Sequence, residues 1–116
     1  MVFVWRMNKM ADLDTVIRYS ELLNLYQNLL SDTQREILDD YYSYNLSISE
    51  IAENRHITRA AVEDAIKKGK KKLDEYEKNL CSLKALQLIH EAKAETNDEK
   101  ITSKLDEVER IMKHGI

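Results

Sequence analysis

The sequence contains no proline and only two glycines, Gly69 and Gly115, among its 116 residues. Tight turns and β-hairpins depend on these two residue types, so their scarcity argues against a protein built from strands. Leucine, lysine, glutamate and alanine, which favour helices, are abundant instead. Hydrophobic residues make up 43% of a chain that has the length of one ordinary domain, so it can bury a core. We predict an all-α protein.

Cysteine is almost absent as well, since Cys81 stands alone and excludes an internal disulfide or a cysteine-based zinc site. The histidines have no metal-ligand spacing, and the sequence has no glycine-rich phosphate loop and no catalytic triad pattern. We therefore expect no catalytic residue, no metal and no cofactor. The opening MVFVWRMNKM has too few apolar residues for a signal peptide or a membrane span, and Met7 or Met10 could also begin the chain. We expect a cytoplasmic protein with a loose N-terminus over residues 1–12.

Positive charge is concentrated in one block. Residues 55–78 hold eight basic and five acidic side chains, whereas the segments on either side are net acidic and the whole chain carries −3. An acidic chain does not bind polyanions indiscriminately. The block is therefore either a local contact for phosphates or the solvated face of a helix.

Helical periodicity and capping signals divide the N-terminal part. Apolar residues at spacings of three and four predict a helix over residues 16–30. Ser31 with Gln34, and Ser47 with Glu50, have the spacing of capping boxes and predict two helix starts. Thr58 can cap the next helix.

That next helix is predicted to be long, because an apolar seam continues at alternating steps of four and three. A polar stretch, TNDEK, predicts a loop, and apolar residues at helical spacing after it predict a last helix. Cys81, beside the seam, is expected to be packed. We predict a domain over residues 13–80 and a C-terminal helical extension over residues 81–116 that forms a dimer. The seam consists of Val62, Ile66, Gly69, Leu73, Tyr76, Leu80 and Leu83, and the last helix carries Ile101, Leu105, Val108 and Met112.

The stretch SISEIAENRHITRAAVEDAIKKG, residues 47–69, resembles a bacterial helix-turn-helix. Ala52 stands at the small position that the second helix crosses, and Ile57 is expected to plug the corner. His56 stands where glycine is usual, and histidine can adopt the positive φ that this place requires. Any helical corner would also bury an alanine and several aliphatic residues. The predicted core of the motif is Ile51, Ala52, Ile57, Val62, Ala65 and Ile66.

A longer segment, LSDTQREILDDYYSYNLSISEIAENRHITRAAVEDAIKKGKKKLDEYEKNL, resembles region 4 of bacterial sigma factors and, more closely, the YlxM-like family of small helix-turn-helix proteins. The resemblance covers roughly residues 16–80. It implies an all-helical, sigma-region-4-like bundle, to which the apolar pattern adds a long connecting helix and a C-terminal helical hairpin. Family members are typically encoded beside genes of the signal recognition particle, which implies a regulatory role with that particle.

The outer face of the second helix carries the candidate contacts. Lysines there suit phosphates, Ala60 suits a thymine methyl and Glu63 a cytosine amino group. Glu63 and Asp64 would repel a nucleic-acid backbone unless Lys67 and Lys68, four residues on, neutralise them. The predicted nucleic-acid-binding residues are Arg55, Thr58, Arg59, Ala60, Glu63, Lys67, Lys68, Lys70 and Lys71.

These observations favour a non-enzymatic regulator that binds DNA or signal recognition particle RNA, with proteins of the particle as further partners. Two alternatives stay open. One is a dimeric DNA-binding transcription regulator, and the other is a protein-interaction module that has kept the fold and lost the nucleic acid. In each case we expect a homodimer through residues 73–112, because two-fold symmetry gives small proteins of this kind two half-sites.

Overall fold

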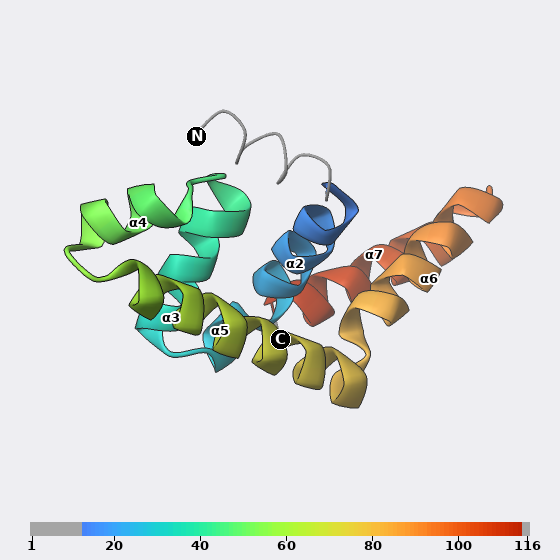
Figure 1. The fold of residues 1–116 in the computed structure, drawn as a ribbon. Coiled ribbons are helices and arrows are strands. Elements are labelled where there is room, and N and C mark those ends of the chain that lie inside the picture. Colours follow the sequence, from blue (N-terminus) through green and yellow to red (C-terminus); the bar gives the residue numbers. More distant parts are fainter. Residues whose placement is uncertain (1–12, 115–116) are drawn as a thin grey trace. The chain divides into compact units, whose positions relative to one another are not determined.

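The computed structural model describes residues 13–114, and over this range the chain forms helices and no strand. The prediction of an all-α protein is therefore confirmed. Residues 1–12, expected to be a loose terminus, lie outside the described residues. The elements, drawn in Figure 1, are α2 (Leu13–Tyr26), a 3₁₀ turn η1 (Gln27–Leu29), α3 (Asp32–Leu38), a π-helical turn η2 (Asp39–Ser43), α4 (Ile48–Arg55), α5 (Arg59–Leu80), α6 (Ser82–Glu95) and α7 (Glu99–His114).

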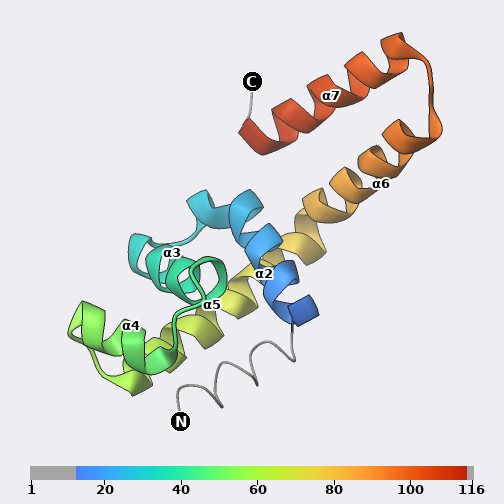
Figure 2. The ribbon, with the colours of Figure 1, turned by 90° about the horizontal axis from the view of Figure 1, so that it is seen from above.

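The chain divides into two compact units, the first ending at Tyr76 and the second beginning at Glu77. The division lies within α5, whereas the sequence predicted a boundary between residues 80 and 81. In the first unit, α4 and the first turn of α5 lie together at one end (Figures 1 and 2). The candidate helix-turn-helix is therefore at an end of its unit.

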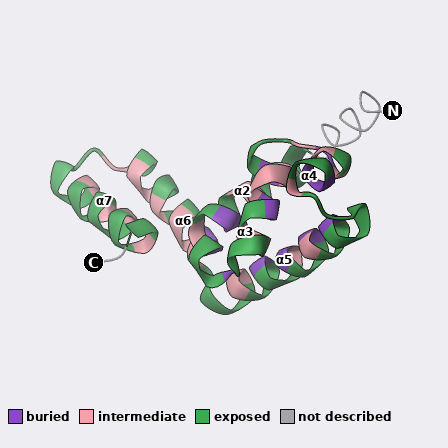
Figure 3. Cartoon of the chain, turned by 90° about the vertical axis from the view of Figure 1, so that its left-hand side faces the viewer, coloured by how far each residue is buried: buried purple, intermediate pink, exposed green. Residues whose placement is uncertain are grey.

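The core of the first unit is built from the apolar stripes of its helices. α2 buries Leu22 and Leu23, and α3 buries Ile37 and Leu38. Figure 3 shows that buried residues occur at intervals along α5, as expected for a helix with one inward face. Its buried residues in this unit are Val62, Ile66, Gly69 and Leu73, the first part of the predicted seam.

Both predicted helix starts are capped by their serine, and the complete capping box is seen at Ser47 with Glu50. The Ser31 hydroxyl accepts from the backbone N–H of Gln34 at 3.2 Å. Ser47 accepts from the N–H of Glu50 at 3.0 Å, and the Glu50 carboxylate accepts in return from the N–H of Ser47 at 3.2 Å. Ser47 is buried, so the capping box also satisfies polar groups that water cannot reach.

One turn differs from the regular helix that periodicity predicts. After Leu38 the chain widens into the π-helical η2, where the N–H of Tyr44 donates to the carbonyl of Asp39 at 3.0 Å. η2 places Tyr42 in the core, where its ring stacks on Tyr19 of α2 with the centroids 5.4 Å apart. Burial raises the pKa of Tyr42 above its ordinary value. The π turn therefore contributes a buried aromatic pair to the unit.

The second unit is a hairpin of α6 and α7, which follows a break at Cys81. Cys81 has φ 55° and is exposed, so the expectation of a packed cysteine was wrong. The Glu77 carboxylate accepts from the N–H groups of Leu83 and Lys84 at 3.0 and 3.1 Å, which caps the start of α6. The buried residue in this region is Leu83, two positions after Cys81.

α7 begins earlier than the apolar pattern indicated. The Asp98 carboxylate accepts from the N–H of Lys100 at 2.8 Å and from the N–H of Ile101 at 3.4 Å, and this cap makes Glu99 and Lys100 helical. Of the predicted TNDEK loop, Thr96, Asn97 and Asp98 therefore stay outside the helices.

Candidate nucleic-acid interface

The turn between α4 and α5 is a left-handed helix stop centred on His56. His56 has φ 56° and ψ 42°, which confirms the positive φ that the sequence predicted. Its N–H donates to the carbonyl of Glu53 at 3.4 Å, and the N–H of Ile57 donates to the carbonyl of Ala52 at 3.1 Å. This pair of bonds is a Schellman motif, which satisfies the last carbonyls of α4. Only Ile57 and Thr58 then separate the turn from α5.

Thr58 caps the second helix, as predicted. Its hydroxyl accepts from the N–H of Ala61 at 3.0 Å, and its carbonyl accepts from the N–H of Val62 at 3.1 Å. The stop at His56 and the start at Thr58 together fix the path between the two helices. The geometry of the corner is therefore determined by local hydrogen bonds between residues 52 and 62.

The predicted core of the motif is largely, but not fully, buried. Ile51 and Val62 are completely buried, Ala52 and Ile66 are also buried, and Ala65 is half-buried. Ile57 is 38% exposed, so the expectation that it plugs the corner was wrong. The other residues of the short turn, His56 and Thr58, are exposed as well.

In the described part of the chain, the outer face of α5 carries one ion pair. The Lys68 ammonium lies 3.0 Å from the Asp64 carboxylate, the i,i+4 pair that the sequence predicted. Within the described residues no ion pair joins Glu63 to Lys67, so the second predicted pair did not form there. Seven of the nine predicted nucleic-acid-binding residues are exposed around this face: Thr58, Arg59, Ala60, Glu63, Lys67, Lys68 and Lys71.

Lys70 instead lies over an aromatic ring of the core. Its Nζ is 4.9 Å from the centroid of Tyr19, a cation–π contact, and the residue is half-buried. The Tyr19 hydroxyl donates to the two Asp74 carboxylate oxygens at 3.0 and 2.9 Å. Burial, followed by this hydrogen bond, raises the pKa of Tyr19 to about 12. Lys70 and Asp74 therefore fasten α5 to α2, and the expectation that Lys70 projects away from the core was wrong.

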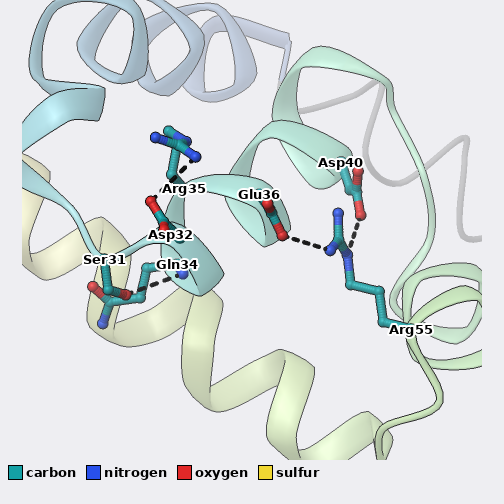
Figure 4. Close-up of polar contacts among 7 residues, drawn as sticks. All are labelled: Ser31, Asp32, Gln34, Arg35, Glu36, Asp40 and Arg55. Carbon is teal, nitrogen blue, oxygen red and sulfur yellow. Dashed lines mark hydrogen bonds and ion pairs between the residues drawn. The ribbon is translucent and has the colours of Figure 1, made fainter.

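Arg55, the last residue of α4, also has an internal role. Figure 4 shows its guanidinium between two carboxylates: Nε lies 2.7 Å from Asp40 and Nη1 lies 3.0 Å from Glu36. The hydrogen bond to Asp40 is the main reason why the pKa of Arg55 is raised. Two of its nitrogens, Nε and Nη1, thus donate to η2 and α3 rather than to a nucleic acid. Arg55 sets the position of α4.

The sequence pattern did not predict these long-range contacts. Arg55 lies 15 residues from Asp40, and Tyr19 lies 55 residues from Asp74. Helical periodicity reports only which residues share a face, so it could not identify these partners.

Two other kinds of site have no counterpart in the described part of the chain. Over residues 13–114, no group of three or more histidine, cysteine, aspartate or glutamate residues is arranged to hold a metal ion. Among the helices of the same range, none combines the length and the apolar character needed to cross a membrane.

An all-helical unit that ends in a capped helix, a left-handed turn and a second capped helix defines a helix-turn-helix protein. Comparison with protein families agrees: residues 13–113 match the family described as "Putative helix-turn-helix protein, YlxM / p13 like". The chain belongs to this family, UPF0122.

Relatives from three bacteria match over most of their length. A UPF0122 protein of Malacoplasma penetrans is 38% identical over 106 residues, which cover 90% of this chain and 98% of the relative. The UPF0122 protein YlxM of Bacillus subtilis is 32% identical over 107 residues, covering 85% and 97%. A UPF0122 protein of Fusobacterium nucleatum is 43% identical over 68 residues, covering 59% and 66%.

Proposed function

We propose that the protein is a non-enzymatic regulator that binds nucleic acid through the outer face of α5 and acts with the signal recognition particle. The observation that carries the proposal is the exposure of Lys67, Lys68 and Lys71 on the second helix of a helix-turn-helix. In this fold the second helix enters a groove of the nucleic acid, and exposed lysines on it meet phosphates. The role with the particle rests on the resemblance to the YlxM-like family, and a cytoplasmic location follows from it.

Charge on this face favours weak, salt-sensitive binding. Asp64 is neutralised by Lys68, so its repulsion of a phosphate is reduced. Glu63 is exposed and has no ion pair within the described residues, so it opposes a phosphate more strongly. Lys67 and Lys71, one helical turn apart, remain available to two phosphates. We therefore expect a preference for shaped RNA, here the signal recognition particle RNA, over base-specific reading of a DNA duplex.

A titration at two salt concentrations tests the proposal. Purified protein is titrated with signal recognition particle RNA, with promoter DNA of its own operon and with random duplex DNA. Phosphate contacts predict that log affinity falls with log salt, with a slope of about −0.7 to −0.9 per contact. Lys67→Glu with Lys71→Glu should abolish binding without unfolding the protein, because both side chains are exposed.

The matched control places the same charge change in the second unit. Lys84→Glu with Lys113→Glu also replaces two exposed lysines, and it should leave binding nearly unchanged. Glu63→Gln should strengthen binding to all three nucleic acids, and more than Asp64→Asn does, because only Asp64 is paired. Equal losses in the two double variants would show that net charge, and not the face of α5, determines the affinity.

The exposed carboxylate of Glu63 favours one alternative, a protein-interaction module. A folded protein that binds none of the three nucleic acids at low salt would support that alternative. A preference for one DNA duplex would instead support a dimeric transcription regulator. In all three cases we propose a homodimer through residues 73–112, because exposed apolar side chains gather in this segment, namely Leu80, Leu88, Ile101, Val108 and Ile111.

A further inference from the structure

The last helix, α7, has an apolar stripe that its own hairpin covers only in part. None of its residues is buried, although α6 packs beside it. Leu105 and Met112 are half-buried. Ile101, Val108 and Ile111 are 47%, 41% and 38% exposed. Large apolar residues grouped on one helix face commonly mark a protein contact.

The uncovered side of this stripe is the side that faces away from α6. Lys93 of α6 pairs with Asp106 and Glu109 of α7, so these two carboxylates mark the side of α7 that faces α6. At about 100° per residue, Ile111 falls on the opposite side of the stripe from Asp106 and Glu109. The hairpin therefore covers one flank of α7 and leaves the other flank open.

Charges on the open flank have an order that suits a second copy of the same helix. Lys104 and Glu107 both lie on this flank. Along the helix axis, Lys104 comes just before the middle of α7 and Glu107 just after it. Among residues 13–114, the one ion pair of Glu107 is a long contact with Arg110, at 3.9 Å. When two copies of α7 run antiparallel, each Lys104 comes opposite the Glu107 of the other copy, and Ile101 comes opposite Ile111. A parallel pairing would not bring Lys104 beside Glu107 across the interface.

We propose that α7 packs antiparallel against α7 of a second copy. Ile101, Val108 and Ile111 make the apolar contacts, and Lys104, which falls between Val108 and Ile111 on this face, pairs with Glu107 of the other copy. The arrangement is isologous, because each contact occurs twice about a two-fold axis near residues 105 and 106. It deepens the homodimer part of the proposed function and names the helix that forms the interface. It does not depend on nucleic-acid binding.

Charge reversal within the full chain tests the pairing. The mass is measured by sedimentation velocity at protein concentrations from about 1 to about 100 μM, a range that brackets micromolar dissociation constants. Lys104→Glu alone, or Glu107→Lys alone, turns both cross-copy pairs into repulsions and should weaken the dimer at least about tenfold. The double variant restores both pairs with reversed signs and should recover most of the dimer. Val108→Asp places two charges among the apolar contacts and should give a monomer.

Lys113→Glu is the matched control, since Lys113 is exposed on the same helix but lies on the flank that carries Asp106 and Glu109. It should leave the dimer unchanged, and circular dichroism should show the same helix content in every variant.

A monomeric wild-type protein would overturn both the dimer and the pairing. A wild-type dimer that Lys104→Glu and Val108→Asp leave intact would overturn the pairing through α7 alone. A double variant as weak as the single ones would overturn the antiparallel orientation. Nucleic-acid titration reports separately on the face of α5.

Discussion

Gly69 of α5 lies directly against Leu38 of α3. A β-carbon built on residue 69 would be 2.5 Å from Cδ1 of Leu38, far inside van der Waals contact. Leu38 is completely buried, so its side chain has little room to move away. Glycine therefore stands in the middle of a long helix, where it costs conformational entropy, because it allows α5 and α3 to approach closely.

We predict that Gly69→Ala destabilises the first unit despite the better helix propensity of alanine. Overpacking a core costs roughly 1–3 kcal/mol, and alanine returns only about 0.8–1.0 kcal/mol in a helix. Removing most of the Leu38 side chain should reverse the sign of the stability change. In a Leu38→Ala background, Gly69→Ala should therefore raise stability. Urea denaturation of the four proteins of this cycle measures both effects. If Gly69→Ala stabilised the otherwise unchanged protein, the close approach would not be real.

The burial of Tyr19, together with its hydrogen bonds to Asp74, should make stability sensitive to alkaline pH. The pKa of Tyr19 is raised to about 12 in the folded protein, above its ordinary value of 10.0. The folded state therefore holds the proton more tightly than the unfolded state does. This contribution is fully present below pH 10 and is lost as the pH rises from 10 towards 12.

We expect Tyr19→Phe to lower stability at neutral pH by roughly 1 kcal/mol, because Asp74 loses a hydrogen-bond donor. The variant should also lose part of the decline in stability above pH 10, while Tyr42 and Lys93, whose pKa values are raised too, continue to contribute to it. Chemical denaturation between neutral pH and pH 11 measures this. Tyr44→Phe is the control, since Tyr44 is exposed, and it should behave as the wild-type protein does.

His56→Gly should be neutral or should stabilise the protein by up to about 1 kcal/mol. Glycine adopts the left-handed conformation without the strain that a β-carbon causes, although it also gains more freedom in the unfolded chain. His56→Val should destabilise, because a β-branched residue tolerates positive φ poorly. Thermal melting of the two variants compares them directly. A lower melting temperature for His56→Gly would mean that the imidazole itself contributes to the turn.

The parts of this structure that sequence could predict are those set by neighbours along the chain. The Ser47–Glu50 capping box, the Thr58 cap and the left-handed His56 each depend on residues within one or two helical turns. The small residue at Ala52 follows from the same local pattern.

Other features depend on where distant segments meet, and no periodicity encodes that. Lys70 shares the lysine-rich run with its exposed neighbours, yet it lies over Tyr19, a residue of a different helix. Cys81 breaks a predicted continuous helix without glycine or proline, because the Glu77 carboxylate can cap the start of the next one. In each case the role of the residue depends on the side chain of a partner, Tyr19 for Lys70 and Glu77 for the break at Cys81. The sequence pattern alone does not distinguish these roles from the alternatives.

The last prediction distinguishes an internal role for Arg55 from contact with nucleic acid. Its partner Asp40 has a side chain only 17% exposed, so removing the guanidinium leaves a poorly solvated carboxylate. Arg55→Ala should therefore cost roughly 1–2 kcal/mol of stability. Arg55→Lys should recover only part of this, because an ammonium cannot reach both carboxylates with a planar fork. Equilibrium denaturation measures these differences.

Arg35→Ala is the matched control, because it removes an arginine from an i,i+3 pair in which Asp32 is 86% exposed, also drawn in Figure 4. It should cost no more than about 0.5 kcal/mol of stability.

If nucleic-acid binding is found, Arg55→Ala should leave the salt dependence of that binding unchanged, since Arg55 holds α4 and does not meet a phosphate. A salt slope less steep by about 0.7–0.9, with stability unaffected, would place Arg55 on the binding surface instead. Double-mutant analysis with Asp40→Asn completes the test: the two substitutions should be strongly non-additive in stability if the pair acts as one unit.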